Sequence, residues 1–274
     1  MFFPDTIDLS ESEKYVLAVR LQTGSFSFAI YQPGKNDAYV YRGTSFKSDI
    51  PYLQQLKRTI FDLNFLTQAF LRTWVEIVSP RHTLVPTLFF DPKEKDNYLD
   101  KTFSVEKGQD QVLSEGIGLD NDKQLVFDVD KDVYEFLSRN LFSPVFTHHV
   151  ASLQRLFNLN SGKTELFSRM YLYFSGNQVD VFVTRNGEIQ TIQSFTNESE
   201  QNLLYFVINI WKAFDMSQLN DRLFLSGDSN KYGKLIPLFS KYIQYVEQKG
   251  APSEAFLLGD DAVKTPIDLL ALLL

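Results

Sequence analysis

Hydrophobic and polar residues alternate through three consecutive segments near the beginning of the chain, and the same arrangement returns after its middle. Alternating segments that are joined by short glycine-containing turns are typical of antiparallel strands in hairpins. The sequence therefore predicts two three-stranded meanders. Their strands are expected at residues 15–22, 26–32 and 38–46, and again at 169–175, 179–184 and 188–195.

The hydrophobic period changes to about 3.6 after each meander, which predicts a helix. These helices are expected at 49–70 and at 198–214, where Asn197 and Glu200 form a candidate capping box. A short apolar segment, expected to be a buried strand, follows each helix. The other predicted elements are strands at 74–80, 110–119, 124–129, 144–150, 222–228 and 254–260, and helices at 91–103, 130–142, 151–160, 231–248 and from 266 onward.

The two halves of the chain align with each other over these elements. The interval from Phe46 to Phe195, which close the third strands, nearly equals the interval from Val75 to Leu223, which open the fourth strands. Order, type and spacing agree, so the sequence predicts an internal duplication. The expected domains are residues 1–162, with an inserted hairpin and helix region, and residues 163–274.

A β-β-β-α-β-α unit that occurs twice resembles the ribonuclease-H-like halves of the actin-like ATPase superfamily. The doubled meander, "TLVP", "HHVASLQRLF" between the halves and "PIDLLALLL" near the end are similar to a domain-of-unknown-function family, mostly from Bacteroides-type bacteria, with an actin-like ATPase fold. The resemblance implies an α/β fold with mixed sheets and a cleft between the halves. In the superfamily that cleft holds ATP with magnesium.

The first phosphate turn of the superfamily begins with an Asp that holds hydrated magnesium. Its tight conformation brings backbone N–H groups close to the phosphates. In this chain Arg20 stands where the resemblance places the Asp. Thr23, Gly24 and Ser25 keep a turn that can hydrogen-bond. An Arg cannot act as a carboxylate, and a solvent-facing hairpin turn is the alternative interpretation.

The second phosphate turn and the adenosine turn are also altered. Tyr173 replaces the first Asp of the second turn, while Gly176 and Asp180 remain. Gly227 and Asp228 follow the predicted strand where the resemblance places the adenosine turn. An ordinary hairpin and a plain strand-to-helix turn are the alternatives at these two places.

Loss of a charged catalytic group commonly costs several powers of ten in rate. Because both expected acids are replaced, we expect a non-catalytic binding or scaffold protein that needs no cofactor and works with a protein partner. A weak ATPase or kinase-like protein that binds ATP with magnesium is the alternative, with Asp180 as the surviving acid. A third hypothesis is the cytoplasmic domain of a membrane complex. No catalytic residue is assigned.

The net charge of the 274-residue chain is -7, which argues against nucleic acid or an anionic membrane as the main partner. Cysteine is absent, so disulfides and thiolate chemistry are excluded. We read no signal peptide and no apolar segment of membrane-spanning length. The expected location is the cytoplasm.

The three histidines of the chain are His82, His148 and His149. Adjacent residues of a strand point to opposite faces, so a strand at 144–150 would separate the second and third imidazoles. The sequence therefore predicts no shared metal site.

Overall fold

The computed structural model describes residues 7–36, 38–105, 108–159 and 167–273. Its strands form two five-stranded sheets and one three-stranded sheet. In the first sheet the order is β3 (Tyr39–Ser45), β2 (Ser25–Tyr31), β1 (Val16–Gln22), β4 (Arg72–Val78) and β8 (Pro144–His148). In the second the order is β11 (Glu188–Thr196), β10 (Gln178–Arg185), β9 (Ser168–Ser175), β12 (Arg222–Gly227) and β13 (Tyr245–Lys249).

The two large sheets have the same topology. In each, an antiparallel meander supplies three strands, and two further strands add in parallel beside the first strand of the meander. Both predicted meanders are confirmed, because alternation with turn glycines is a local signal that holds in both places. The mixed α/β architecture expected for an actin-like fold is confirmed as well.

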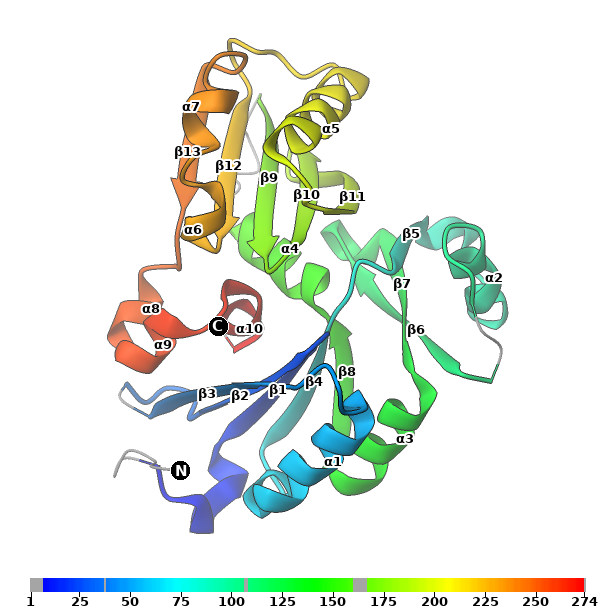
Figure 1. The fold of residues 1–274 in the computed structure, drawn as a ribbon, viewed down its shortest axis with the longest axis vertical. Helices are drawn as coiled ribbons and strands as arrows, with labels where there is room; N and C mark the ends of the chain where they lie inside the picture. Colours follow the sequence, from blue (N-terminus) through cyan, green and yellow to red (C-terminus); the bar gives the residue numbers. More distant parts are fainter. Residues whose placement is uncertain (1–6, 37, 106–107, 160–166, 274) are drawn as a thin grey trace.

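The smaller sheet is an insertion in the first half, on the right of Figure 1. Its order is β5 (His82–Pro86), β7 (Lys123–Asp130) and β6 (Asp110–Ile117), and α2 (Lys95–Asp100) contacts all three strands. This confirms the predicted hairpin at 110–129. The structure adds β5, an edge strand that the sequence does not predict because Pro86 interrupts its apolar run.

Helices cover the sheets. The first sheet has α1 (Tyr52–Asp62) and α3 (Lys131–Asn140), and α5 (Glu200–Ala213) packs its buried face into the core of the second. The helix predicted at 49–70 is shorter, because α1 ends at Asp62 and a 3-10 turn follows at Asn64–Thr67. The cap of α5 is Ser199, whose hydroxyl accepts from the Asn202 amide, so the capping box expected at Asn197 is wrong.

Two predicted elements near the end of the chain are wrong. Residues 231–248 do not form one helix. They form α6 (Ser229–Tyr232), α7 (Ile236–Phe239) and then β13, which pairs in parallel with β12. Residues 254–260 form the short helix α8 (Glu254–Leu257) rather than a strand. Pairing with β12 gives residues 245–249 ladder hydrogen bonds that outweigh their helical period.

The last helices return to the first sheet. In Figure 1, α8, α9 (Asp260–Lys264) and α10 (Ile267–Leu273) lie between the two large sheets, on the side of β3. Leu269, Leu270 and Leu272 are buried against Ala18 and Ala29, whose small side chains leave room for the helix. The boundary predicted at residues 161–163 lies outside the described residues, and the division into 1–162 and 163–274 stays a prediction.

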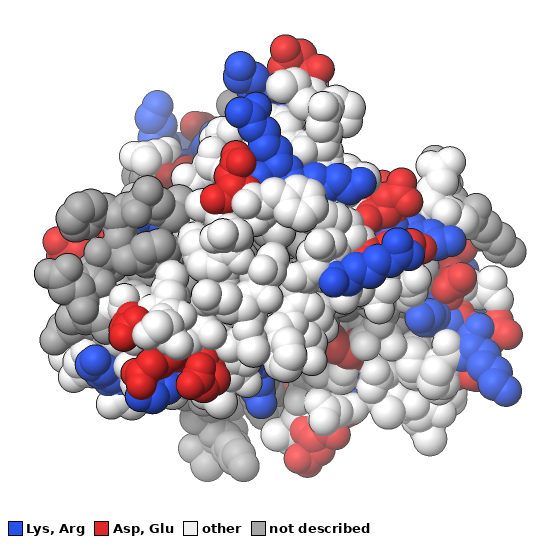
Figure 2. All heavy atoms as spheres, turned by 90° about the horizontal axis from the view of Figure 1, so that it is seen from below, with Lys and Arg blue, Asp and Glu red and all other residues white. Residues whose placement is uncertain are grey.

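Charged side chains of both signs are interspersed on the face seen in Figure 2. None of the helices in the described part of the chain combines the length and the apolar character that crossing a membrane requires.

Candidate functional site: a polar cleft with a closed floor

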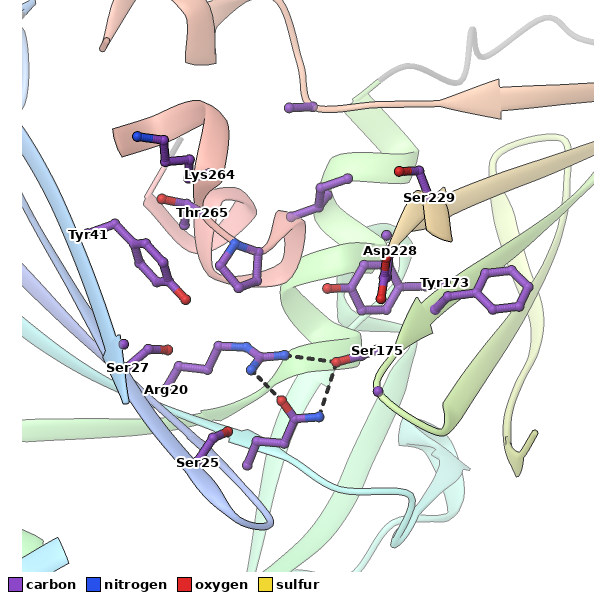
Figure 3. Close-up of a pocket in the computed structure, with 18 of the residues that line it drawn as sticks. Arg20, Ser25, Ser27, Tyr41, Tyr173, Ser175, Asp228, Ser229, Lys264 and Thr265 are labelled. Carbon is purple, nitrogen blue, oxygen red and sulfur yellow. Dashed lines mark hydrogen bonds between the residues drawn. The ribbon is translucent and has the colours of Figure 1, made fainter. Parts of the chain in front are cut away.

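A cleft of about 1000 Å³ opens between the two large sheets and the C-terminal helices (Figure 3). Its walls come from the meander of the first half, from the β9–β10 turn, from the turn after β12 and from the α9–α10 junction. Hydroxyl groups of Ser25, Ser27, Ser175 and Ser229 line it. At least one residue from each of the three turns named by the resemblance therefore lines this cavity.

Arg20 forms the floor of this cleft. Its Nε and Nη2 atoms donate to Oδ2 of Asp268, on α10, at 2.9 and 2.7 Å. Its Nη1 donates to Gln22 at 2.7 Å, and Nη2 also donates to Ser175 at 3.1 Å. The guanidinium thus joins β1 to α10 and to the end of β9, and only 5% of Arg20 is exposed.

The charge of Arg20 is secured by its partner. Burial alone would favour the neutral side chain, but the carboxylate of Asp268 raises the pKa of Arg20 above its ordinary value. Tyr173 shares the floor, and burial together with Asp268 raises the pKa of its phenol well above the usual range. Both residues that replace the expected acids are therefore held in place with a fixed protonation state.

Glu76 lies behind the floor, on β4, and is fully buried. Ser152 donates to its Oε1 at 2.7 Å, and its Oε2 is 3.8 Å from Nε of Arg20. Burial, with a contribution from Asp268, raises the pKa of Glu76 to about 8. This carboxyl group is therefore mostly protonated at neutral pH, and it is not among the residues that line the cleft.

The residues predicted from the three turns are only partly brought together. Ser25, Gly176, Gly227 and Asp228 line the cleft. Thr23 lines a separate hollow between the first sheet and the insertion, and Gly24 occupies the turn with a positive φ of 75°. Their role in binding a ligand stays a prediction.

Asp180 is the expected acid that the structure places deepest. Its carboxylate is fully buried and accepts hydrogen bonds from Ser194 and from Gln178 at 2.5 and 2.7 Å. His149 contacts its other oxygen through Nε2 at 2.9 Å. Burial opposes the charge, yet the pKa of Asp180 is lowered because His149 and these donors stabilise the carboxylate. It is absent from the cleft lining.

The turn after β12 needs its glycine. Gly227 has a φ of 89°, and a Cβ atom there would lie 2.2 Å from the carbonyl oxygen of Phe174. Asp228 then caps α6, since its Oδ1 accepts from the Asn230 amide at 3.0 Å. The backbone of β9 and this turn are therefore in direct contact, and any side chain at 227 would force them apart.

The histidines lie together, contrary to the expectation from the sequence. The strand β8 ends at His148 and α4 (His149–Leu159) begins at the next residue, so the two rings do not point to opposite faces of one strand. The ring centroids of His148 and His149 are 4.6 Å apart, and those of His82 and His148 are 5.1 Å apart. Within the described residues, no group of three or more suitable side chains has an arrangement that could hold a metal ion.

The partners that hold Arg20 in the floor of the cleft are not predicted from the sequence. Asp268 stands as a single acid inside the apolar run "PIDLLALLL", and an isolated charge in a buried helix is a signal for a buried partner. Glu76 and Ser152 carry no comparable signal, because one lies in a strand and the other in a helix that are both ordinary by composition.

The comparisons with known proteins agree with this architecture. A chain from Bacteroides thetaiotaomicron VPI-5482, described as a protein with actin-like ATPase fold and unknown function, superimposes with a TM-score of 0.82 at 22% identity, covering 97% of this chain and 98% of that one. A chain of the PilM-PilN type IV pilus biogenesis complex superimposes with a TM-score of 0.55 at 10% identity, covering 94% and 96%.

Comparison with proteins of curated description yields no match. The structural similarity shows that this chain has the actin-like ATPase fold. The model of the family described as "Protein of unknown function (DUF3822)" matches residues 4–246. The chain therefore belongs to that family.

Proposed function

We propose that this protein is a non-catalytic binding protein that retains the actin-like cleft without its chemistry. One observation carries the proposal: the buried ion pair of Arg20 with Asp268 occupies the place where the resemblance puts an acidic residue that holds hydrated magnesium. Magnesium needs oxygen ligands, and a guanidinium repels it. The carboxylate that lies near this place is already committed to Arg20.

The other acids near the cleft support the same conclusion. Glu76 is mostly protonated at neutral pH and sits behind the floor, and Asp180 is engaged by His149 and two further donors. Asp228 lines the cleft and caps α6. A general base or magnesium site needs a carboxylate that faces the reacting groups, and these three are protonated, buried or already bonded.

A weak nucleotide-binding protein is the second candidate. The observation that favours it is the size of the cleft, about 1000 Å³, together with the presence of Ser25, Gly176, Gly227 and Asp228 on its walls. In this candidate function ATP with magnesium would bind without efficient turnover.

For the leading function the expected partner is another protein in the cytoplasm. The fold is suited to such a role, because the PilM-PilN complex contains a chain with this topology. The polar network of Arg20 connects the two halves without any ligand, so the surfaces on either side are held in a defined relative position.

The test is turnover and binding of nucleotide by the purified chain. We expect no release of phosphate from Mg-ATP above the protein-free rate, and no heat of binding with Mg-ATP or Mg-ADP in isothermal titration. Steady turnover of ATP would overturn the proposal.

Binding without turnover would favour the second candidate. That binding should then weaken in Ser25→Ala and Asp228→Asn, whereas Asp260→Asn on α9, outside the cleft lining, serves as the matched control. Asn at 228 keeps the cap of α6, which makes it a milder change than any substitution of Gly227.

A further inference from the structure

A second hollow, of about 520 Å³, lies between the insertion and the second half. One wall is β5, with His82, Thr83 and Leu84, and the other is residues 190–195 of β11. Both strands are at the edge of their sheets, and they lie next to each other at the right of Figure 1. Two open strand edges therefore border one groove. If the protein is a binding protein, as proposed above, this groove is a place where a partner could be held.

The direction of the backbone groups of β11 follows from one hydrogen bond. The amide of Asn197 donates to the carbonyl of Asn177 at 2.7 Å, and hydrogen-bonded pairs recur at every second residue of an antiparallel ladder. Residues 195, 193 and 191 therefore bond to β10. The backbone groups of Ile192 and Ser194 point the other way, toward the open edge.

The outward-facing backbone groups of β5 are identified by a similar hydrogen bond. The amide of Thr87 donates to the carbonyl of Asp122 at 2.9 Å, so Val85 and Thr83 bond to β7. The N–H and C=O groups of Leu84 then point to the open edge. The backbone of Pro86, two residues further along β5, faces the same open edge but has no N–H. Hydrogen-bond donors on this edge are therefore limited to the part of β5 beside the groove.

The groove is nearly without charge. Among its described lining residues there is no carboxylate, and the single Lys123 is paired with Asp122. Burial lowers the pKa of His82 to about 4, so its imidazole is neutral at neutral pH. Leu84, Phe103 and Ile192 provide apolar contacts.

An aromatic surface continues from one wall. Phe195 lines the groove and stacks on Phe206 of α5 at a centroid distance of 5.1 Å, and Phe206 meets Tyr205 edge to face at 5.9 Å. Tyr205 is 66% exposed. Large exposed aromatic side chains beside an open strand edge are typical anchors for a bound segment.

We propose that this groove holds an extended, uncharged peptide segment of a partner protein, which runs between β5 and β11. The segment hydrogen-bonds to the outward backbone groups of Leu84 on β5 and of Ile192 and Ser194 on β11. Strand addition supplies affinity through the backbone, and alternate side chains of the peptide enter the apolar groove. Backbone groups at strand spacing select an extended peptide over a helix or a small molecule.

The experiment uses a random-peptide display library selected on the full-length chain, followed by titration of the enriched peptide labelled with a fluorophore. We expect peptides with apolar residues at alternate positions and few charges. Leu84→Pro removes the outward N–H without touching the ladder to β7, as Pro86 does naturally. It should weaken binding about fivefold to tenfold, the equivalent of one hydrogen bond. The matched control Leu84→Thr also loses the leucine side chain but keeps the N–H, so Leu84→Pro should bind the peptide about fivefold to tenfold more weakly than Leu84→Thr does.

Hydrogen exchange of the unmodified chain gives a second readout that does not depend on the folding of a variant. The peptide should slow exchange at the amides of Leu84, Ile192 and Ser194. Enriched peptides that protect other amides, or that bind Leu84→Pro as tightly as the original chain, would overturn the proposal. A dimer of the chain that Leu84→Pro dissociates would overturn it too, because the edges would then serve a second copy. Nucleotide assays are independent of this groove, so each failure identifies its own proposal.

Discussion

Two buried charge pairs connect different parts of this molecule, and they behave differently toward protons. Arg20 with Asp268 ties β1 to α10, and His149 with Asp180 ties α4 to β10. All four side chains are at most 5% exposed. Arg20 stays charged at every pH that a protein tolerates, whereas His149 loses its charge as pH rises through its folded pKa, which lies above 6.5. The cation of the first pair is therefore permanent, whereas the cation of the second pair depends on pH.

The direction of that dependence follows from the two pKa values. Burial opposes the charge of His149, but Asp180 raises its pKa above 6.5, so its contribution to stability is complete below 6.5 and is lost as pH rises through the folded pKa. The pKa of Asp180 is lowered from 3.8, so its contribution is present above 3.8 and is lost as pH falls through the folded value. The pair is at full strength in the mildly acidic window between these values.

The largest effect is expected from Asp268→Asn, which leaves the buried charge of Arg20 without its carboxylate. Removing one partner of a buried ion pair typically costs about 3–5 kcal/mol. Urea unfolding followed by circular dichroism measures the loss.

The matched control is Asp261→Asn, on the neighbouring helix. Asp261 pairs with Arg42 where both side chains are about one quarter to one third exposed, and such pairs contribute about 1 kcal/mol or less. A loss in Asp268→Asn that does not exceed the loss in Asp261→Asn would contradict the assignment of Arg20 as a permanently charged, buried connection.

A smaller effect is expected from Asp180→Asn. The amide can still accept a hydrogen bond from His149, but it no longer favours the imidazolium, so burial will lower the pKa of His149. We expect a loss of about 2–3 kcal/mol at pH 6, because His149 can give up its proton instead of staying charged and unpaired. NMR titration of His149 together with unfolding at pH 6 measures both effects.

Ser194→Ala is the control for that variant, since it removes one hydrogen bond to Asp180 and leaves the charge in place. It should cost about 1 kcal/mol. If the pKa of His149 is unchanged in Asp180→Asn, the ion pair does not set it.

The smallest effect on the free energy of unfolding is expected from the other two histidines. Their pKa values are lowered, whereas that of His149 is raised. Burial lowers the pKa of His82 to about 4 and that of His148 well below 6.5. The unfolded chain therefore takes up protons first, and stability is lost as pH falls below 6.5. For His82 alone the loss between pH 7 and pH 5 is about 2 kcal/mol.

His82→Gln isolates this contribution. The difference in unfolding free energy between the original chain and the variant should change by about 2 kcal/mol between pH 7 and pH 5. A difference that is the same at both pH values would mean that His82 titrates normally and is accessible to water.

The elements of the fold that the sequence predicted are those with local causes. Alternation and turn glycines determine the meanders, and these are confirmed in both halves. The predictions for residues 231–248 and 254–260 were wrong because both segments depend on distant partners. In the first, β13 forms by pairing with β12, some twenty residues away, and in the second α8 packs on the first sheet. Helical period alone does not reveal such long-range pairing.

The site was predictable to the same extent. The turns that contribute Ser25, Gly176, Gly227 and Asp228 were located through the family resemblance, and these four residues line one cleft. Asp268 could not be assigned to Arg20, since 248 positions separate them along the chain. The clustering of His82 with His148 depends on β5 and β7 folding back over β8, which no periodicity in these segments indicates.

The position of α10 has a consequence for biosynthesis. Arg20 emerges from the ribosome 248 residues before the carboxylate that neutralises it. Until then Ala18 and Ala29 lack the leucines that cover them. The first sheet can therefore reach its final state only after Asp268 has been synthesised, and a chain interrupted shortly before Asp268 would expose an uncompensated cation and an uncovered apolar surface to chaperones and proteases.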